Sequence, residues 1–233
     1  MFNGKLKAIT FSFDDGTIHD RRLVELFKRY HVKGTFHINS GIFGLEASAM
    51  VDGEAVDVTR LQAEEVVSLY RGHELAAHTL THPPLINESD ETVISQVERD
   101  RERLSFLCGY EVAGLAYPCG RPNSDARVER LVREYTNCQY ARSIDFSGHF
   151  DLPTDLYHVC PSIYHTHYDK MMRMGREFLS LEPKTPKLFM IMGHSYELDV
   201  ADRWDRLEEF LQLICGREDI FYGTMRQVLL DVD

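Results

Sequence analysis

Residues 6–38 read LKAITFSFDDGTIHDRRLVELFKRYHVKGTFHI and contain a strand pattern, a helix pattern and a second strand pattern in that order. Leu6–Phe13 and Gly34–Ile38 are rich in β-branched and aromatic residues, whereas the apolar residues of Arg21–Tyr30 recur at helical spacing. A strand, a helix and a strand joined by short connections form a βαβ unit with parallel strands. The segment therefore predicts an α/β fold in which helices lie outside a parallel sheet.

The same alternation continues to the end of the chain. Further strands are expected at Glu74–Ala77, Gly114–Tyr117, Tyr140–Arg142, His158–Ser162, Leu188–Met192 and Ile220–Tyr222. Further helices are expected at Ala63–Tyr70, Glu91–Cys108, Ala126–Tyr135, Arg203–Cys215 and Met225–Leu230. Residues 41–59 and 145–157 are expected to be long loops that wall the active site. We expect residues 1–233 to form a single domain, built on an open sheet or a closed barrel.

The composition and net charge of the chain disfavour some classes of binding partner and some cellular locations. The chain has 26 Lys plus Arg against 37 Asp plus Glu, for a formal net charge of −11, which disfavours a nucleic acid partner. Its five cysteines are dispersed and fit reduced thiols in the cytoplasm better than disulfides. The sequence has no signal-peptide pattern and no run of 18 apolar residues. We therefore expect a soluble cytoplasmic protein without a membrane segment; its oligomeric state is left open.

Two polar segments directly follow predicted strands. Asp14 and Asp15 end the first strand and precede Gly16, where a turn can bring both carboxylates to one cavity, although Asp-Asp-Gly is also an ordinary polar turn. His78 and His82 follow the strand Glu74–Ala77, and imidazoles four residues apart can bind one metal if a helical turn separates them. One carboxylate and two imidazoles make a three-ligand site for a divalent metal, with positions left for water and substrate.

Two later segments also lie at predicted strand ends. Leu115–Arg121 reads LAYPCGR, a strand stopped by proline and glycine, and alone it indicates no more than a strand-to-loop junction. His194 follows the buried strand Leu188–Met192, a position that favours a functional histidine, although a packed core histidine also fits the pattern. The order of the four segments makes a single site the better interpretation.

In this order the segments resemble the polysaccharide deacetylase family, whose shared domain is called the NodB homology domain. Ser12–Gly16 (SFDDG) is similar to the family element T-F-D-D-G, and Gly72–His82 (GHELAAHTLTH) to its G-H-E…H-[ST]-x-x-H element. Tyr117–Gly120 (YPCG) is similar to R-x-P-Y-G, and Met192–His194 to L-x-H. The resemblance implies a distorted (β/α) barrel of about seven strands, with a metal site at the C-terminal ends of the strands.

The resemblance also implies roles for individual residues. Asp15, His78 and His82 would bind one divalent metal ion, zinc by default, with nickel, cobalt or iron also compatible. Asp14 would be the general base that takes a proton from the attacking water, and His194 the general acid that protonates the leaving amine. The oxyanion would lie against the metal and the backbone N–H of Cys119.

The third segment departs from the family pattern. The family arginine that pairs with the catalytic aspartate is replaced by Ala116, and the aromatic position by Cys119. We expect Arg142 to supply the missing cation, with Arg121 as an alternative. The expected substrate and oxyanion residues are Tyr117, Pro118, Cys119, Tyr196 and Trp204. Glu197 also follows His194 closely and is expected to line the substrate pocket.

Other residues are harder to assign from the sequence. The family aspartate that orients the acid histidine has two candidates here, Asp145 and Asp155. His165 and His167 are expected in a loop near the mouth of the cleft, and His37 in a packed, hydrogen-bonded position. Cys119 as a nucleophile is an alternative without an obvious partner.

The predicted function is hydrolysis of a carbon–nitrogen bond other than a peptide bond, foremost deacetylation of an N-acetylated sugar or polysaccharide. A small-molecule amidohydrolase acting on an amide, ureide or imide is the first alternative. A non-heme Fe(II) enzyme would use the same three ligands. An inactive carbohydrate-binding module is a further alternative, which the presence of Asp14 and His194 disfavours.

Overall fold

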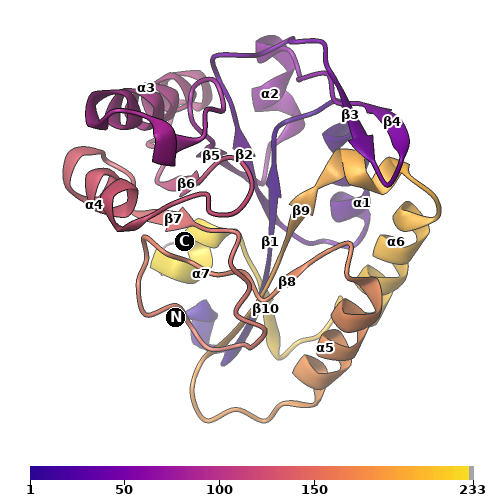
Figure 1. The fold of residues 1–233 in the computed structure, drawn as a ribbon. Helices are drawn as coiled ribbons and strands as arrows, with labels where there is room; N and C mark the ends of the chain where they lie inside the picture. The colour runs from indigo at the N-terminus through magenta and orange to yellow at the C-terminus, as the bar shows by residue number, and fades with distance from the viewer. Residues whose placement is uncertain (231–233) are drawn as a thin grey trace.

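A computed structural model describes residues 1–230, and its main feature is a curved sheet of parallel strands (Figure 1). Along the sheet the strands follow the order β7 (Tyr140–Arg142), β6 (Gly114–Ala116), β5 (Glu74–Ala77), β2 (Gly34–Ile38), β1 (Lys7–Asp14), β9 (Lys187–His194) and β8 (Ile163–Tyr164). The strand β10 (Ile220–Tyr222) pairs with the start of β1. Val159 forms a parallel bridge with Arg142 just before the chain enters β8. The sheet therefore has the predicted form of a distorted (β/α) barrel.

Helices surround this sheet, with α3 and α4 on the left of Figure 1 and α1, α5 and α6 on the right. They are α1 (Asp20–Arg29), α2 (Ala63–Leu69), α3 (Asp90–Cys108), α4 (Ala126–Tyr135), α5 (Tyr168–Ser180), α6 (Arg203–Ile214) and α7 (Met225–Leu230), with short 3₁₀ turns η1 (Phe2–Gly4), η2 (Leu85–Asn87) and η3 (Ser195–Asp199). Among residues 1–230, no helix combines the length and the apolar character needed to cross a bilayer.

Alternate side chains of strand β1 enter two different apolar clusters, one on each face of the sheet. Ile9, Phe11 and Phe13 belong to the large apolar core that includes the helices, whereas Ala8 belongs to a second cluster that includes Met225 of α7. Successive residues of a strand point to opposite faces, so Asp14 lies on the face opposite to Phe13. The strand therefore directs this carboxylate to the inside of the barrel.

Most predicted elements agree with the structure to within two residues, but the strand predicted at His158–Ser162 is wrong. Val159 makes only an isolated bridge, and the strand begins at Ile163. Pro161 explains the difference, because proline has no N–H to donate to a neighbouring strand. The predicted loop 41–59 contains an antiparallel hairpin of β3 (Ser48–Val51) and β4 (Glu54–Asp57), which the sequence analysis does not predict.

Helix α5 is also absent from the sequence-based prediction. It buries Met171, Met174 and Phe178 on one face, the spacing of an amphipathic helix. Gly175 lies in its middle, and glycine lowers helix propensity by about 1 kcal/mol relative to alanine. A Cβ at Gly175 would lie 2.9 Å from Phe210 of α6. The glycine therefore permits the close packing of α5 against α6 that stabilises the helix.

Candidate metal centre and active site

The parallel register places the polar residues of neighbouring strands at one level. Asp14 at the end of β1 is paired with His37 on β2 and with His194 on β9. Ala116 on β6 is paired with Arg142 on β7. Ligand sites in parallel α/β folds gather at such C-terminal strand ends.

The turn after β1 brings two consecutive carboxylates to one cavity. Asp15 has φ 84° and Gly16 has φ 60°, both in the left-handed region. A Cβ at residue 16 would lie 2.7 Å from Cγ2 of Ile38, so the turn requires glycine. Asp14 and Asp15 consequently line the same cavity, as the sequence predicts for a turn at this glycine.

The loop after β5 carries the two histidines of the predicted metal site. Nδ1 of His78 donates a hydrogen bond to the carbonyl oxygen of Ala116 at 2.8 Å, which leaves Nε2 free to act as a ligand. This Nε2 lies 3.8 Å from Oδ1 of Asp15, and Nε2 of His82 lies 3.5 Å from the same oxygen.

The helical turn predicted between these histidines is wrong. Thr79 and His82 have φ values of 68° and 64°, which no right-handed helix contains. Side chains from elsewhere hold the loop in this shape: Nδ2 of Asn39 donates to the carbonyl oxygens of His78 and Thr79, and the N–H of His78 donates to Oδ2 of Asp100 at 2.9 Å. These buried polar partners stabilise the non-helical path of the loop.

The donor set of Asp15, His78 and His82 fits a divalent metal. Their ligand atoms lie within 4.8 Å of one another. Two atoms bound to one tetrahedral ion at about 2.1 Å lie roughly 3.4 Å apart, close to the spacing seen here. Burial lowers the pKa of His78 to about 4 and also lowers that of His82, so both imidazoles are neutral at pH 7, the form that binds metal.

The carboxylate of Asp15 faces the two histidines and is kept ionised. Burial tends to raise its pKa, but the positive charges of His194 and Arg60 outweigh burial and lower it. Nη1 of Arg60 lies 2.8 Å from Oδ1 of Asp15, but it is aligned with the backbone carbonyl of Asp15 instead. Oδ1 thus accepts no well-aligned hydrogen bond from the described residues and retains lone pairs for a cation.

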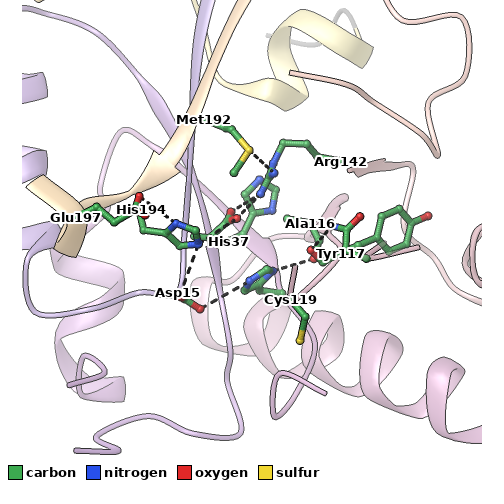
Figure 2. A network of polar contacts seen from close by, with 12 residues as sticks. Asp15, His37, Ala116, Tyr117, Cys119, Arg142, Met192, His194 and Glu197 are labelled. Atoms are coloured by element: carbon green, nitrogen blue, oxygen red, sulfur yellow. Dashed lines mark hydrogen bonds and ion pairs between the residues drawn. The ribbon is translucent and has the colours of Figure 1, made fainter. Parts of the chain in front are cut away.

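Asp14 is paired with a buried arginine, Arg142, which Figure 2 shows in contact with Met192. Nη2 of Arg142 lies 2.5 Å from both carboxylate oxygens of Asp14, and its Nη1 is 3.1 Å from the sulfur of Met192. Burial opposes ionisation of Asp14, but nearby positive charge, chiefly that of Arg142, lowers its pKa overall. The contact agrees with the prediction that Arg142 compensates for Ala116. The alternative, Arg121, donates instead to the carbonyl of Ile144.

His37 lies beside this pair in a packed position, as predicted. Its Nδ1 is 3.3 Å from the carbonyl oxygen of Ala77. Burial and the charge of Arg142 lower the pKa of His37 to about 3, so this imidazole stays neutral. Neutral His37 therefore adds no further positive charge beside Asp14.

His194 faces both aspartates from β9. Its Nε2 lies 4.0 Å from Oδ2 of Asp14 and 3.9 Å from Oδ2 of Asp15. Burial would lower its pKa, but the hydrogen bond with Glu197 and the charges of Asp15, Glu197 and Asp14 raise it to about 9. The imidazole is therefore a proton donor at neutral pH.

The predicted partners of this histidine are wrong. Asp155 binds Arg133, with oxygen–nitrogen distances of 2.6 and 2.7 Å, and Asp145 lies 3.3 Å from Nε of Arg121. Both aspartates belong to surface ion pairs that loop 145–157 makes with neighbouring elements. Glu197, only three residues after His194, contacts the imidazole instead.

A cavity of about 550 Å³ opens onto these groups. Of the predicted substrate residues, Tyr117, Cys119 and Tyr196 line it, whereas Pro118 is buried beside it. Trp204 is wrongly predicted: it packs in the core, and its indole N–H donates to Asp199 at 3.1 Å. His167 lines the cavity, and His165 is buried behind it.

Several residues of the site escape sequence analysis. Arg60 and Tyr164 contact the predicted catalytic or metal-binding side chains, and Phe146 lines the cavity. Glu197 is expected from the sequence to line the pocket, and its contact with His194 has a local signal, a carboxylate three residues after a histidine. Arg60 and Phe146 come from loops and Tyr164 from β8, and their positions depend on tertiary packing.

The whole fold is similar to several solved structures. One, from Mycobacterium smegmatis, is assigned to the polysaccharide deacetylases and has 15% identity and a TM-score of 0.68, with 98% of this chain and 91% of that chain covered. A family 4 carbohydrate esterase from Streptomyces lividans in complex with acetate has 13% identity and a TM-score of 0.57, over 94% and 92% of the two chains. At these identities the similarity establishes the fold alone.

A third similar structure is a mutant of a pseudoenzyme from carbohydrate esterase family 4 with restored enzymatic activity, at 13% identity and a TM-score of 0.60, covering 96% of this chain and 67% of that one. Curated protein sequences contain no match to the chain. The model of the polysaccharide deacetylase family matches residues 3–137, more than half of the sequence. The chain therefore belongs to the polysaccharide deacetylase family, whose enzymes hydrolyse carbon–nitrogen bonds other than peptide bonds.

Proposed function

We propose that this protein is a metal-dependent deacetylase that releases acetate from an N-acetylated sugar or polysaccharide. One divalent ion, zinc by default, would be held by Asp15, His78 and His82. The proposal depends most on one observation: these three side chains line the same cavity as Asp14 and His194. A metal site, an ionised carboxylate and a protonated imidazole around one cavity are the groups that amide hydrolysis requires.

When bound, the metal would supply Lewis acidity toward the amide carbonyl and lower the pKa of water. Asp14, ionised and fixed by Arg142, takes the proton of the water whose oxygen bonds to the carbonyl carbon. His194 gives a proton from Nε2 to the amide nitrogen as the carbon–nitrogen bond breaks. The free amine leaves and acetate remains. The backbone N–H of Cys119 is proposed to stabilise the oxyanion.

The cavity fits a sugar in size and character. A volume of about 550 Å³ lies within the usual range for small-ligand sites. Aromatic side chains line it, and such rings pack against the apolar faces of sugar rings; they are Tyr117, Phe146, Tyr164 and Tyr196. The number of sugar units that bind is left to experiment.

Three alternatives make different predictions. A small-molecule amidohydrolase would release ammonia or an amine other than a sugar. A non-heme Fe(II) enzyme would require Fe(II) and oxygen. A binding module would turn over nothing, and a similar structure described as a pseudoenzyme mutant illustrates that the fold does not guarantee catalysis. The base Asp14 and the acid His194 favour catalysis, because binding alone requires neither.

Metal removal should abolish activity, and metal return should restore it. We expect acetate release from at least one of a panel of N-acetylated sugars, measured beside ammonia release from small amides. Enzyme stripped with a chelator should lose nearly all turnover, and zinc, nickel, cobalt or iron should be compared for rescue without oxygen. Acetate release that survives complete stripping would contradict the metal-dependent mechanism, and ammonia release alone would favour the amidohydrolase.

The thiol of Cys119 should be dispensable. Its Sγ lies 3.7 Å from Nδ1 of His82, but burial and the charge of Asp15 raise the thiol pKa, so a thiolate is disfavoured. Cys119→Ala keeps the backbone N–H and should retain acetate release to within about fivefold, since no covalent role is lost. Complete loss of turnover, with the metal still bound, would instead favour a cysteine nucleophile.

A further inference from the structure

The acid histidine has an unusual set of partners on the side away from the metal site. Nδ1 of His194 lies 2.7 Å from the hydroxyl of Tyr164 on β8 and 3.4 Å from Oε2 of Glu197 on η3. The same hydroxyl lies 2.6 Å from Oε2 of Glu197. The phenol is therefore the nearer partner of the imidazole, and the carboxylate lies within hydrogen-bond range of both groups.

The protons available on the phenol, the carboxylate and the imidazole determine which group donates in each of these hydrogen bonds. A phenol has one proton to donate, and an ionised carboxylate only accepts. Burial tends to raise the pKa of Glu197, but hydrogen bonds and charges of His165 and His194 lower it, so Glu197 is ionised. The hydroxyl of Tyr164 therefore donates to Glu197, and its oxygen accepts the Nδ1–H of His194.

A second histidine, His165, also contacts the carboxylate of Glu197. Nε2 of His165 lies 3.0 Å from Oε2 of Glu197, and His165 is buried. A Cβ on Gly193 would lie 1.8 Å from the ring of His165, so only glycine leaves room for this imidazole against β9. Nη1 of Arg203 also donates to the carbonyl oxygen of Glu197 at 3.0 Å.

We propose that Tyr164 and Glu197 form a positioning relay that holds His194 with Nδ1 protonated and Nε2 directed to the leaving group. The inference rests on the proposed function, and it replaces the expected aspartate by a tyrosine–glutamate pair. Because Nδ1 keeps its proton in both states of the imidazole, the proton that the amine receives comes from Nε2. Neither Tyr164 nor Glu197 transfers a proton to substrate in this scheme.

Leaving-group dependence separates this role from a general structural one. Expulsion of an amine requires protonation, whereas the nitrophenolate of 4-nitrophenyl acetate leaves without it. In Tyr164→Phe and Glu197→Gln, we expect kcat for an N-acetylated sugar to fall at least tenfold with KM within about twofold. Hydrolysis of 4-nitrophenyl acetate and the metal content should stay within about threefold of the wild-type values. The double variant should be no worse than the poorer single variant, because both residues act through one histidine.

Tyr168→Phe is the matched control, because Tyr168 likewise donates its hydroxyl to a carboxylate, that of Glu209, at a partly buried position on α5. It should behave as wild type on both substrates. Equal losses on the amide and the ester, or full amide turnover in both Tyr164→Phe and Glu197→Gln, would overturn the relay while leaving the proposed function intact. A wild-type enzyme that releases no acetate from any N-acetylated sugar would instead refute the proposed function, and the relay with it.

Discussion

Asp14→Asn is expected to lower kcat/KM for acetate release by at least about 10³-fold while the protein keeps its metal. The carboxylate is ionised, buried and held by Arg142 within reach of His194, the arrangement expected for a base beside the acid. The amide of asparagine has nearly the same shape but cannot accept a proton at neutral pH. Asp15, His78 and His82, which make up the proposed metal site, are unchanged by this substitution.

Asp15→Asn is the matched variant for this test, since it alters the neighbouring residue by the same chemical change. We expect it to lose both metal and activity, because an amide oxygen is a much weaker ligand than a carboxylate for this kind of site. Metal content per chain and acetate release, measured on both variants, separate the roles. If Asp14→Asn loses the metal and Asp15→Asn keeps it, the ligand and the base are exchanged.

The sequence predicts the fold and the centre of the site because both depend on local patterns. Strand periodicity places Asp14 at the end of β1, and a parallel sheet carries His194 to the same level. Gly16 is required for the turn that brings Asp15 beside Asp14. These positions follow from backbone geometry that a few residues determine.

The surrounding residues depend on contacts that no local pattern encodes. The loop from His78 to His82 takes left-handed φ values because Asn39 and Asp100 bind its backbone groups. Arg60 reaches Asp15 from a loop 45 residues away in sequence. The helical turn predicted between the histidines therefore fails, and Arg60 goes unpredicted, although both histidines are correctly expected beside Asp15.

The position of Arg142 shows how a substitution in one strand can be compensated in the next. Ala116 on β6 and Arg142 on β7 are paired in register. A guanidinium from β7 can therefore reach Asp14 in place of the family arginine expected at residue 116. The small side chain of Ala116 leaves the interior of the barrel free for it. Comparison of this one motif with the family pattern shows only that the arginine at residue 116 is missing. The sheet register explains how Arg142 takes its place.

Arg142→Ala should be strongly destabilising as well as inactivating. Arg142 is fully buried, and removing one partner of a buried ion pair typically lowers the free energy of unfolding by about 3–5 kcal/mol. The loss should be largest near neutral pH and shrink on acidification, because protonation of Asp14 removes the unpaired charge. The wild-type pair accounts for this trend: Arg142 lowers the pKa of Asp14, so its stabilisation is present above the unfolded pKa of 3.8 and is lost as pH falls below it. Chemical denaturation at several pH values measures both trends.

The activity of the same variant tests whether the arginine keeps the base ionised. Without Arg142, burial dominates and raises the pKa of Asp14, so the acidic limb of the pH–rate profile should move to higher pH. Asp14→Asn/Arg142→Met is the control for stability alone, since it removes both charges and should recover part of the lost free energy of unfolding without recovering turnover. A folded Arg142→Ala enzyme with an unchanged pH–rate profile would show that another group supplies this charge. A shifted acidic limb, together with partial stability rescue in the double variant, would identify Arg142 as the residue that keeps Asp14 ionised inside the barrel.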